Sequence, residues 1–194
     1  MLTGRTVRDL LDAFASADPT PGGGSAAALA ASVGASLLMM VAALPKTRSN
    51  SDDDRAALAE ARASLTAVRE LLTDAIDADT AAYDRVVAAY RLPKAADEQK
   101  AARTAAIQAA LRTATDVPLG VMRLSAQALD TAKTVEAHGH AAASSDVGVA
   151  IALLTAGLNG ARLNVAVNLE GIRDEDYTRA VSAEAERLAT NRTQ

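Results

Sequence analysis

Hydrophobic residues recur every three or four positions along most of the chain, which is the spacing of amphipathic helices. No stretch shows the alternation of apolar and polar residues that is typical of a half-buried strand. With proline and glycine as end signals, the pattern predicts a helix that ends before Pro19, a second over residues 25–44 and a long third over residues 54–91.

The second half of the chain divides in the same way. Since proline is favoured in the first helical turn, Pro93 and Pro118 are predicted to begin the fourth and fifth helices. A helix over residues 144–171 and a terminal helix from Asp174 complete the set. The chain shows no internal repeat and no long charge block. The predicted fold class is therefore an all-α, single-domain helical bundle over residues 1–194.

Two of these helices, over residues 25–44 and 147–169, are apolar on almost every side and rich in alanine and glycine. Small residues one turn apart, such as Ala30 and Gly34, let helix backbones approach closely. A helix that is apolar all round must be buried, and one small bundle can hardly cover two of them. We therefore expect these central helices to pack against a second copy, in a homodimer or a larger assembly.

The helix over residues 25–44 is also about as long as a membrane-spanning segment. Its residues are mostly alanine, serine and glycine, which gain little on entering lipid, and neither flank carries a basic cluster or an aromatic belt. We therefore expect this helix to be buried in protein, and the predicted partners do not include a membrane.

Composition narrows the class of function. The 194 residues contain no cysteine, which excludes disulfides and thiolate chemistry and fits a reducing cytoplasm. A net charge of -4, one phenylalanine and no tryptophan leave neither a basic stripe for phosphates nor aromatic platforms for bases. We expect a cytoplasmic protein that does not bind nucleic acid.

The loop from Pro19 to Ser25 leads directly into the second helix and contains Gly22, Gly23 and Gly24. Glycines let a ligand approach the backbone closely, and the N–H groups at the start of a helix attract anions. The lysine of a phosphate-binding P-loop is missing. The loop is therefore interpreted either as an anion site or as a flexible cap before the helix.

Asp79 lies in the middle of the apolar stripe of the third helix, whereas Asp74, Asp77 and Asp84 face solvent by the same geometry. The stripe consists of Val68, Leu72, Ala75, Ile76, Tyr83, Val86, Val87 and Tyr90. A buried carboxylate costs several kcal/mol unless it is paired, hydrogen-bonded or protonated. Asp79 is therefore either a structural residue, as one half of an ion pair or as a cap across the bundle, or a catalytic carboxylate whose pKa is raised by burial.

Three polar residues stand out on the helix over residues 144–171. Asp146 at its start is either a plain N-cap or a functional carboxylate. Asn164 and Asn168, one turn apart, either bridge helices or bind a polar ligand. Along an unbroken helix, Asp146 and Asn164 lie about 27 Å apart, too far to act on one reacting centre within one subunit. A dimer interface could bring copies of them together.

The only histidines are His138 and His140. Without a third ligand nearby, a His-x-His pair is weak evidence for zinc, so we expect no metal site. The sequence also lacks a Gly-x-Ser-x-Gly nucleophile elbow. Acid–base catalysis by carboxylates is the chemistry that remains.

Four stretches together resemble the formiminotransferase-cyclodeaminase family, specifically its cyclodeaminase domain and the related stand-alone methenyltetrahydrofolate cyclohydrolases. They are PTPGGGSAAA from Pro19, AYRLPK from Ala89, SDVGVA from Ser145 and LNVAVN from Leu163. They occur in the family's order, and the likeness spans nearly the whole chain. The resemblance implies an all-helical dimer whose folate sites are built from both subunits.

Members of this family close 5-formiminotetrahydrofolate to 5,10-methenyltetrahydrofolate and release ammonia, or they hydrolyse the methenyl compound to 10-formyltetrahydrofolate. Both reactions pass through a tetrahedral one-carbon centre and require proton transfers, for which Asp79 and Asp146 are the candidate catalytic residues. The other candidates bind substrate: Gly22, Gly23, Gly24, Ser25, Arg91 and Lys94 the glutamate tail, Asn164 and Asn168 the pterin, and Ser145 beside Asp146. No cofactor is expected beyond tetrahydrofolate as the substrate.

Two stretches differ from the family pattern. Residues 45–50 replace a lysine-rich stretch, and residues 139–142 replace a Gly-Asn-x-Asn pattern. The second change removes two amides beside Asp146, where His140 could supply an acid–base group instead. These differences keep open the alternative of a non-catalytic helical dimer that binds folate or serves as a scaffold.

Overall fold

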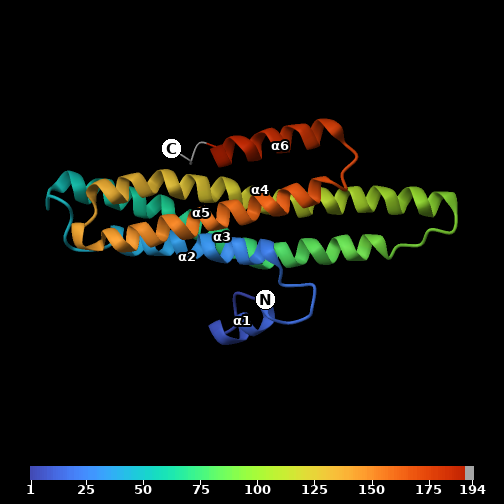
Figure 1. Cartoon of the computed structure of the whole chain (residues 1–194), viewed down its shortest axis with the longest axis horizontal. Coiled ribbons are helices and arrows are strands. Elements are labelled where there is room, and N and C mark those ends of the chain that lie inside the picture. The colour runs from blue at the N-terminus through green and yellow to red at the C-terminus, as the bar shows by residue number, and fades with distance from the viewer. Residues whose placement is uncertain (191–194) are drawn as a thin grey trace.

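The computed structural model describes residues 1–190 as six α-helices and, within that range, no β-strand. The helices are α1 (Val7–Phe14), α2 (Gly23–Ala42), α3 (Asp52–Tyr90), α4 (Asp97–His138), α5 (Ser144–Leu169) and α6 (Glu175–Thr190), with a 3-10 turn, η1 (Ala141–Ala143), before α5. Helices α2 to α5 form a bundle of long rods, and α1 and α6 lie on opposite sides of it (Figure 1). The all-α prediction is confirmed. The single-domain span of residues 1–194 stays a prediction, and its last four residues lie outside the described range.

The core runs along the middle of the bundle, where all four long helices meet. Each contributes a leucine or methionine without solvent exposure: Leu38 from α2, Leu72 from α3, Met122 from α4 and Leu154 from α5. Alanines fill most of the remaining core positions, so the helices approach one another closely. The amphipathic periodicity of the sequence therefore corresponds to one shared apolar seam.

The closest helix contact is between α2 and α5, and glycine permits it. A Cβ atom on Gly157 would lie 2.7 Å from Ala31 Cβ and 2.8 Å from the carbonyl oxygen of Ala27, both on α2. A Cβ atom on Gly34 would lie 2.8 Å from the carbonyl oxygen of Ala150 on α5. The small residues of these two helices thus pair them within one subunit.

Helix α4 corrects the prediction that Pro118 begins a helix. The helix is continuous over 42 residues, and Pro118 lies buried inside it. Proline in a helix interior removes one hydrogen bond and is normally unfavourable. The prediction placed a helix start at Pro118 because proline is favoured in the first turn of a helix. The apolar periodicity, which continues unbroken on both sides of position 118, was the better guide.

The segment before α2 folds back onto α3. The backbone N–H of Leu2 and the hydroxyl of Thr3 donate hydrogen bonds to the carboxylate of Asp77. Asp77 is therefore half-buried, so the prediction that it faces solvent is wrong. Helix α1 itself buries none of its residues, and it begins after Thr6, whose side chain caps the N–H of Asp9.

At the end of the bundle where α2 leads into α3, the connecting loop is fastened around Asp54. His138 Nδ1 lies 2.8 Å from Asp54 Oδ1, the N–H of Ser49 lies 2.7 Å from Oδ2, and the hydroxyl of Thr47 lies 3.1 Å from Oδ2. The hydrogen bonds from His138 and Ser49 hold the pKa of Asp54 well below its usual range. The ionised carboxylate therefore ties the start of α3 to the end of α4.

Helices α2 and α5 leave one apolar surface uncovered. Its exposed members are Val33 and Met40 on α2 and Val149, Leu163 and Val167 on α5. By length and composition alone, α2 and residues 141–169 are also apolar enough to cross a membrane, a test that core helices of soluble proteins pass as well. We call these five residues the α2–α5 face.

Candidate functional site

A cavity of about 310 Å³ lies where the start of α2 meets α3, α4 and α5. Six of the predicted site residues line it: Gly22, Gly23, Gly24, Asp79, Asn164 and Asn168. Its remaining walls are Pro19, Thr20, Tyr83, Val86, Leu111, Ala114 and Val167. Residues far apart in sequence thus converge on one space, within the size range of ligand sites.

Asp79 is the only carboxylate that lines this cavity, and the first turn of α2 holds it in place. The backbone N–H of Ser25 donates to Asp79 Oδ2 over 2.8 Å, and Ser25 Oγ lies 3.0 Å from the same oxygen. Burial raises the pKa of Asp79 above its ordinary value, although both contacts from Ser25 favour the ionised form. A carboxyl group whose pKa is raised by burial, and which lines a cavity, is suited to take up and release a proton during a reaction.

Ser25 contributes to the site from behind the cavity wall. It is fully buried, and its hydroxyl also lies 2.8 Å from the carbonyl oxygen of Ile76 on α3. The structure therefore places Ser25 against Asp79, whereas its predicted contact with substrate stays a prediction.

Gly24 allows this approach of α2 to the carboxylate. A Cβ atom at position 24 would overlap the carboxylate of Asp79, whereas a Cβ atom on Gly23 would make ordinary contacts with the side chain of Asn164, the nearest at 3.5 Å. The two neighbouring glycines thus differ: Gly24 is required by the position of Asp79, and Gly23 lies where a small side chain fits.

Asn164 and Asn168 face the cavity from α5, and each amide nitrogen is already occupied. Asn164 Nδ2 donates to the carbonyl oxygen of Gly160 over 2.9 Å, one turn back on the same helix. Asn168 Nδ2 donates to the carbonyl oxygen of Ala114 on α4 over 2.7 Å. Asn168 therefore bridges helices as well as lining the cavity, so the two interpretations of this residue are compatible.

Four other predicted site residues lie elsewhere in the subunit. Arg91 and Lys94 lie exposed between α3 and α4, at the end of the molecule distant from Asp54. Ser145 is exposed and Asp146 half-buried in the first turn of α5. Because α5 is unbroken, Asp146 lies about 27 Å along it from Asn164. Within one subunit, Asp146 and Asp79 do not share a cavity.

The sequence interpretation missed several walls of the cavity. Tyr83 and Val86 were assigned to the apolar stripe of α3, yet Tyr83 is 41% exposed and both line the cavity. Leu111 and Ala114 of α4 could not be recognised as site residues from the sequence, because an apolar residue in a core cannot be distinguished by its pattern from one in a pocket wall. The polar or glycine positions nearby, Asp79, the Gly22–Gly24 loop and the two asparagines of α5, were the indications that a site was near.

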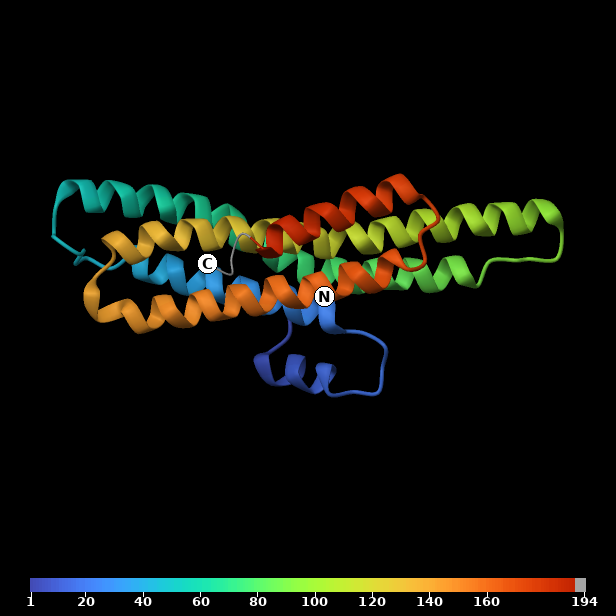
Figure 2. The same ribbon diagram turned by 45° about the horizontal axis from the view of Figure 1, so that its top comes forward.

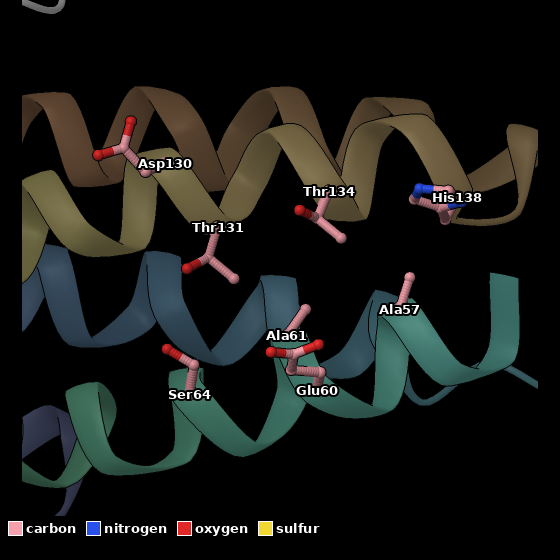
Figure 3. A pocket seen from close by; sticks show the side chains of 8 residues that line it. All are labelled: Ala57, Glu60, Ala61, Ser64, Asp130, Thr131, Thr134 and His138. Atoms are coloured by element: carbon pink, nitrogen blue, oxygen red, sulfur yellow. The ribbon is translucent and has the colours of Figure 1, made fainter. Parts of the chain in front are cut away.

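A larger hollow of about 570 Å³ lies between α3 and α4 toward the Asp54 end (Figure 3). Its lining residues are Ala57, Glu60, Ala61, Ser64, Asp130, Thr131, Thr134 and His138. It contains none of the predicted catalytic or binding residues, and His138 at its end is bonded to Asp54. In the described residues, no group of three or more histidine, aspartate or glutamate side chains is placed to hold a metal ion. The cavity around Asp79 is therefore the better candidate site.

Comparison with known proteins decides the family. The formiminotransferase-cyclodeaminase family matches residues 6–187. The chain belongs to this family. A methenyltetrahydrofolate cyclohydrolase of Methylorubrum extorquens is 42% identical over 188 residues, which cover 97% of this chain and 90% of that protein.

Other members of the formiminotransferase-cyclodeaminase family are similar over a shorter span or in fold alone. The formimidoyltransferase-cyclodeaminase of Gallus gallus is 34% identical over 100 residues, 52% of this chain and only 18% of that longer protein. The crystal structure of a formiminotetrahydrofolate cyclodeaminase from Thermotoga maritima superposes with a TM-score of 0.87, at 23% sequence identity, over 99% of this chain and 92% of that one. The helical arrangement described above is thus the fold of a known cyclodeaminase.

Proposed function

We propose that this protein is a folate one-carbon enzyme that hydrolyses 5,10-methenyltetrahydrofolate to 10-formyltetrahydrofolate. The observation that carries the proposal is the half-buried carboxylate of Asp79, which lines the cavity, has a raised pKa and is fixed by the first turn of α2. The relative that is similar over nearly the whole chain bears the name of this activity. Cyclodeamination of 5-formiminotetrahydrofolate is the second candidate, because the relatives similar over half of the chain are named for it.

The proposed hydrolysis needs one group that first accepts and then donates a proton. Asp79 takes a proton from water as the water oxygen bonds to the methenyl carbon, which gives a tetrahedral centre between N5 and N10. Asp79 then returns the proton to N5 as the bond between N5 and that carbon breaks. The hydroxyl proton of the tetrahedral centre passes to solvent, and the carbon remains on N10 as a formyl group. In cyclodeamination the same group would protonate the departing nitrogen, which leaves as ammonia. No cofactor other than tetrahydrofolate as the substrate is required.

The cavity offers this substrate hydrogen-bond acceptors. The amide nitrogens of Asn164 and Asn168 each donate one hydrogen bond to a helix carbonyl, and both of their oxygens remain available to accept bonds from a ligand. Oxygens in such positions accept bonds from the N–H groups of a pterin ring. A cavity of about 310 Å³ is at the lower end for a ligand site, so the glutamate tail would lie outside it, along α3 and α4 toward Arg91 and Lys94.

We further propose that the α2–α5 face is covered by a second copy of the chain. Val149 and Leu163, 53% and 64% exposed, lie at equal distances along α5 from the exposed residue Ala156. A twofold axis beside Ala156 would pair α5 with its antiparallel copy and bury both residues of each subunit. The same operation would bring Asp146 of the partner subunit to the part of α5 that carries Asn164 and Asn168. The homodimer would then complete a site to which Asp79 and Asp146 both contribute.

The activity is tested with purified protein by following the absorbance of 5,10-methenyltetrahydrofolate. Loss of that absorbance faster than in buffer, with 10-formyltetrahydrofolate as product, is the expected result. Growth of the absorbance from 5-formiminotetrahydrofolate, with release of ammonia, would establish the second candidate instead. If neither substrate reacts but one of them binds, the protein is the non-catalytic folate-binding dimer.

The dimer is tested by sedimentation of variants with a charge on an exposed leucine. Leu163→Glu places a carboxylate on the α2–α5 face and is expected to give monomers. Leu71→Glu is the matched control, because Leu71 is 54% exposed on α3, away from this face. Wild-type protein that sediments as a monomer would refute the assembly.

Shared sites are tested by mixing two inactive variants, Asp79→Asn and Asp146→Asn. If each site takes Asp79 from one subunit and Asp146 from the other, mixed dimers contain one intact site and regain part of the activity. Mixtures as inactive as the separate variants would mean that the two residues act within one subunit, whereas an active Asp146→Asn variant on its own would mean that Asp146 has no catalytic part.

We also propose a cytoplasmic location without membrane or nucleic-acid partners. The absence of cysteine fits a reducing compartment. The apolar character of α2 and α5 does not require a membrane. These helices pack on one another through Gly34 and Gly157 and leave one face for a partner. Recovery of the expressed protein in the soluble fraction without detergent is the expected result.

A further inference from the structure

Pro118 and Asn168 are connected through a single backbone carbonyl. In an α-helix the N–H of residue 118 would donate to the carbonyl oxygen of Ala114, four residues earlier. Proline has no N–H, and its ring displaces that carbonyl from the helix axis. The bond that the Ala114 carbonyl lacks within α4 is supplied by Asn168 Nδ2 of α5, at 2.7 Å.

This bond fixes which way the amide of Asn168 points. If the amide were turned over, Asn168 Oδ1 would face the carbonyl oxygen of Ala114, and two acceptors without a hydrogen between them repel. The nitrogen therefore stays on Ala114, and Oδ1 is left as the acceptor of a residue that lines the cavity. In an ordinary helix the Ala114 carbonyl would already accept one bond from residue 118 and would not be displaced outward by a proline ring, so its bond to Asn168 would be weaker and the orientation of the amide less firmly held.

We propose that Pro118 is a positioning residue for the substrate site. By withholding an N–H inside α4, it reserves the carbonyl of Ala114 for Asn168 and so presents the Asn168 oxygen to an N–H group of the ligand. The inference rests on the proposed function in one respect, because that N–H group belongs to the pterin of a reduced folate. The orientation of the amide is a property of the protein alone.

The test replaces Pro118 with alanine, which restores the missing N–H. In Pro118→Ala the Ala114 carbonyl regains a partner in its own helix, so its bond to Asn168 weakens and the amide is held less firmly. The KM for 5,10-methenyltetrahydrofolate should rise roughly two- to tenfold, the effect of one hydrogen bond, with little change in kcat. The same variant should melt at a temperature equal to or higher than the wild type, since alanine is a far better helix residue than proline.

Gly120→Ala is the matched control on the same helix. A Cβ atom at Gly120 meets nothing within 4 Å, and Gly120 does not line the cavity. This variant should also gain thermal stability, but its KM should be that of the wild type. A rise in KM in both variants would overturn the proposal, because stiffening of α4 would then explain it.

Coupling between the two residues is tested in the Asn168→Ala background. There the amide is gone, so Pro118→Ala should leave KM unchanged, and the two effects should be strongly non-additive. Full additivity would mean that Pro118 acts on substrate by another route and would overturn the proposal.

A measurement independent of activity separates this inference from the proposed function. The side-chain amide signal of Asn168, assigned by NMR through its loss in Asn168→Ala, should show slowed hydrogen exchange in the wild type and fast exchange in Pro118→Ala. Equal exchange in the two proteins overturns the inference, whatever the substrate proves to be. If the amide behaves as expected and no folate reacts, the proposed function fails while the positioning of Asn168 by Pro118 stands.

Discussion

At the scale of single residues, the position of Asp79 meets two opposing requirements. Chemistry needs a carboxylate that changes protonation near neutral pH, whereas folding favours keeping charge in water. The first turn of α2 resolves this conflict, because it donates the N–H of Ser25 to the carboxylate and carries Gly24 where a side chain would collide with it. The two residues explain why a glycine-rich start of α2 lies beside an acid.

Replacement of Asp79 by asparagine should separate activity from stability. Turnover should fall at least about a hundredfold, as loss of a general acid or base typically causes. Because burial raises the pKa of Asp79 in the folded protein, its ionised form is disfavoured there. That cost is absent below the pKa of the unfolded chain, about 3.9, and develops as the pH rises through the folded pKa. At pH 7, Asp79→Asn should therefore melt at the wild-type temperature or above it, as calorimetry can show. Wild-type turnover in this variant would remove Asp79 from the mechanism.

The two neighbouring glycines of α2 should respond differently to alanine. Gly24→Ala places a methyl group against the carboxylate of Asp79, so kcat should fall at least about tenfold as Asp79 is displaced from Ser25. Gly23→Ala makes only ordinary contacts with Asn164, so its effect should be confined to a modest change in KM. Steady-state kinetics of the two variants distinguish these outcomes, and equal effects would mean that the loop acts only as a flexible cap.

At this scale the sequence located the polar half of the site. An aspartate on an apolar stripe and two asparagines on a small-residue helix are exceptions to a periodic pattern, and such exceptions are visible in one sequence. The carbonyl of Ala114 is not visible in this way, because every residue has one. Only the structure, which aligns α4 with α5, shows that this carbonyl accepts a hydrogen bond from Asn168 in place of the N–H that Pro118 lacks.

At the scale of helices, periodicity predicted all of the long elements but misplaced the break at Pro118. One hydrogen bond across helices, from Asn168, satisfies the carbonyl that proline leaves without a partner and lets α4 continue. Such compensation depends on tertiary structure, so residue preferences at position 118 could not predict it. Dimerisation through α2 and α5 was inferred from their apolar surfaces. The structure shows that their small residues pair the two helices within one subunit, which leaves the α2–α5 face as the remaining argument for a dimer.

The contact between α2 and α5 predicts a stability difference between two glycines of α5. Gly157→Ala drives a methyl group into Ala31 and the carbonyl of Ala27, and such overpacking costs about 1–3 kcal/mol. Gly148→Ala meets nothing within 4 Å and should gain up to about 1 kcal/mol from helix propensity. Urea denaturation of both variants measures the difference. If Gly157→Ala were as stable as Gly148→Ala, the close approach of the two helices would not contribute to stability.

At the scale of the whole molecule, the two ends of the bundle differ in how firmly their helices are held together. The end around Asp54 is closed by hydrogen bonds between the α2–α3 loop and the end of α4. The Asp79 cavity lies nearer the other end, where α3 and α4 run past the remaining helices (Figure 2). The molecule thus has one end fastened by hydrogen bonds and one open end, where only α3 and α4 extend.

The fastened end should make folding sensitive to acid. Since the folded pKa of Asp54 is held below its usual range, its contribution to stability is complete above the unfolded pKa of about 3.9 and is lost as the pH falls below it. Asp54→Asn should lower the melting temperature at pH 7. The melting temperature of this variant should also fall less steeply than that of the wild type between about pH 5 and pH 3, which lie on either side of the unfolded pKa. Asp52→Asn is the control, because the Asp52 side chain is 97% exposed. Parallel acid profiles for wild type and Asp54→Asn would show that other carboxylates govern the acid limb.

The open end has a consequence for motion. Beyond Ile76 only Ala82 and Ala89 of α3 are buried, and the small cluster of Ala89 with Ile107, Ala110 and Leu111 is separate from the main core. Amide deuteration should therefore begin in residues 82–110, where local opening exposes little apolar surface. Tyr83 and Val86 lie within residues 82–110 and also line the cavity, so a bound folate should slow deuteration of this segment. A folate bound at Asp79 would thus slow exchange in the parts of α3 and α4 that extend past the other helices, as well as in the cavity wall.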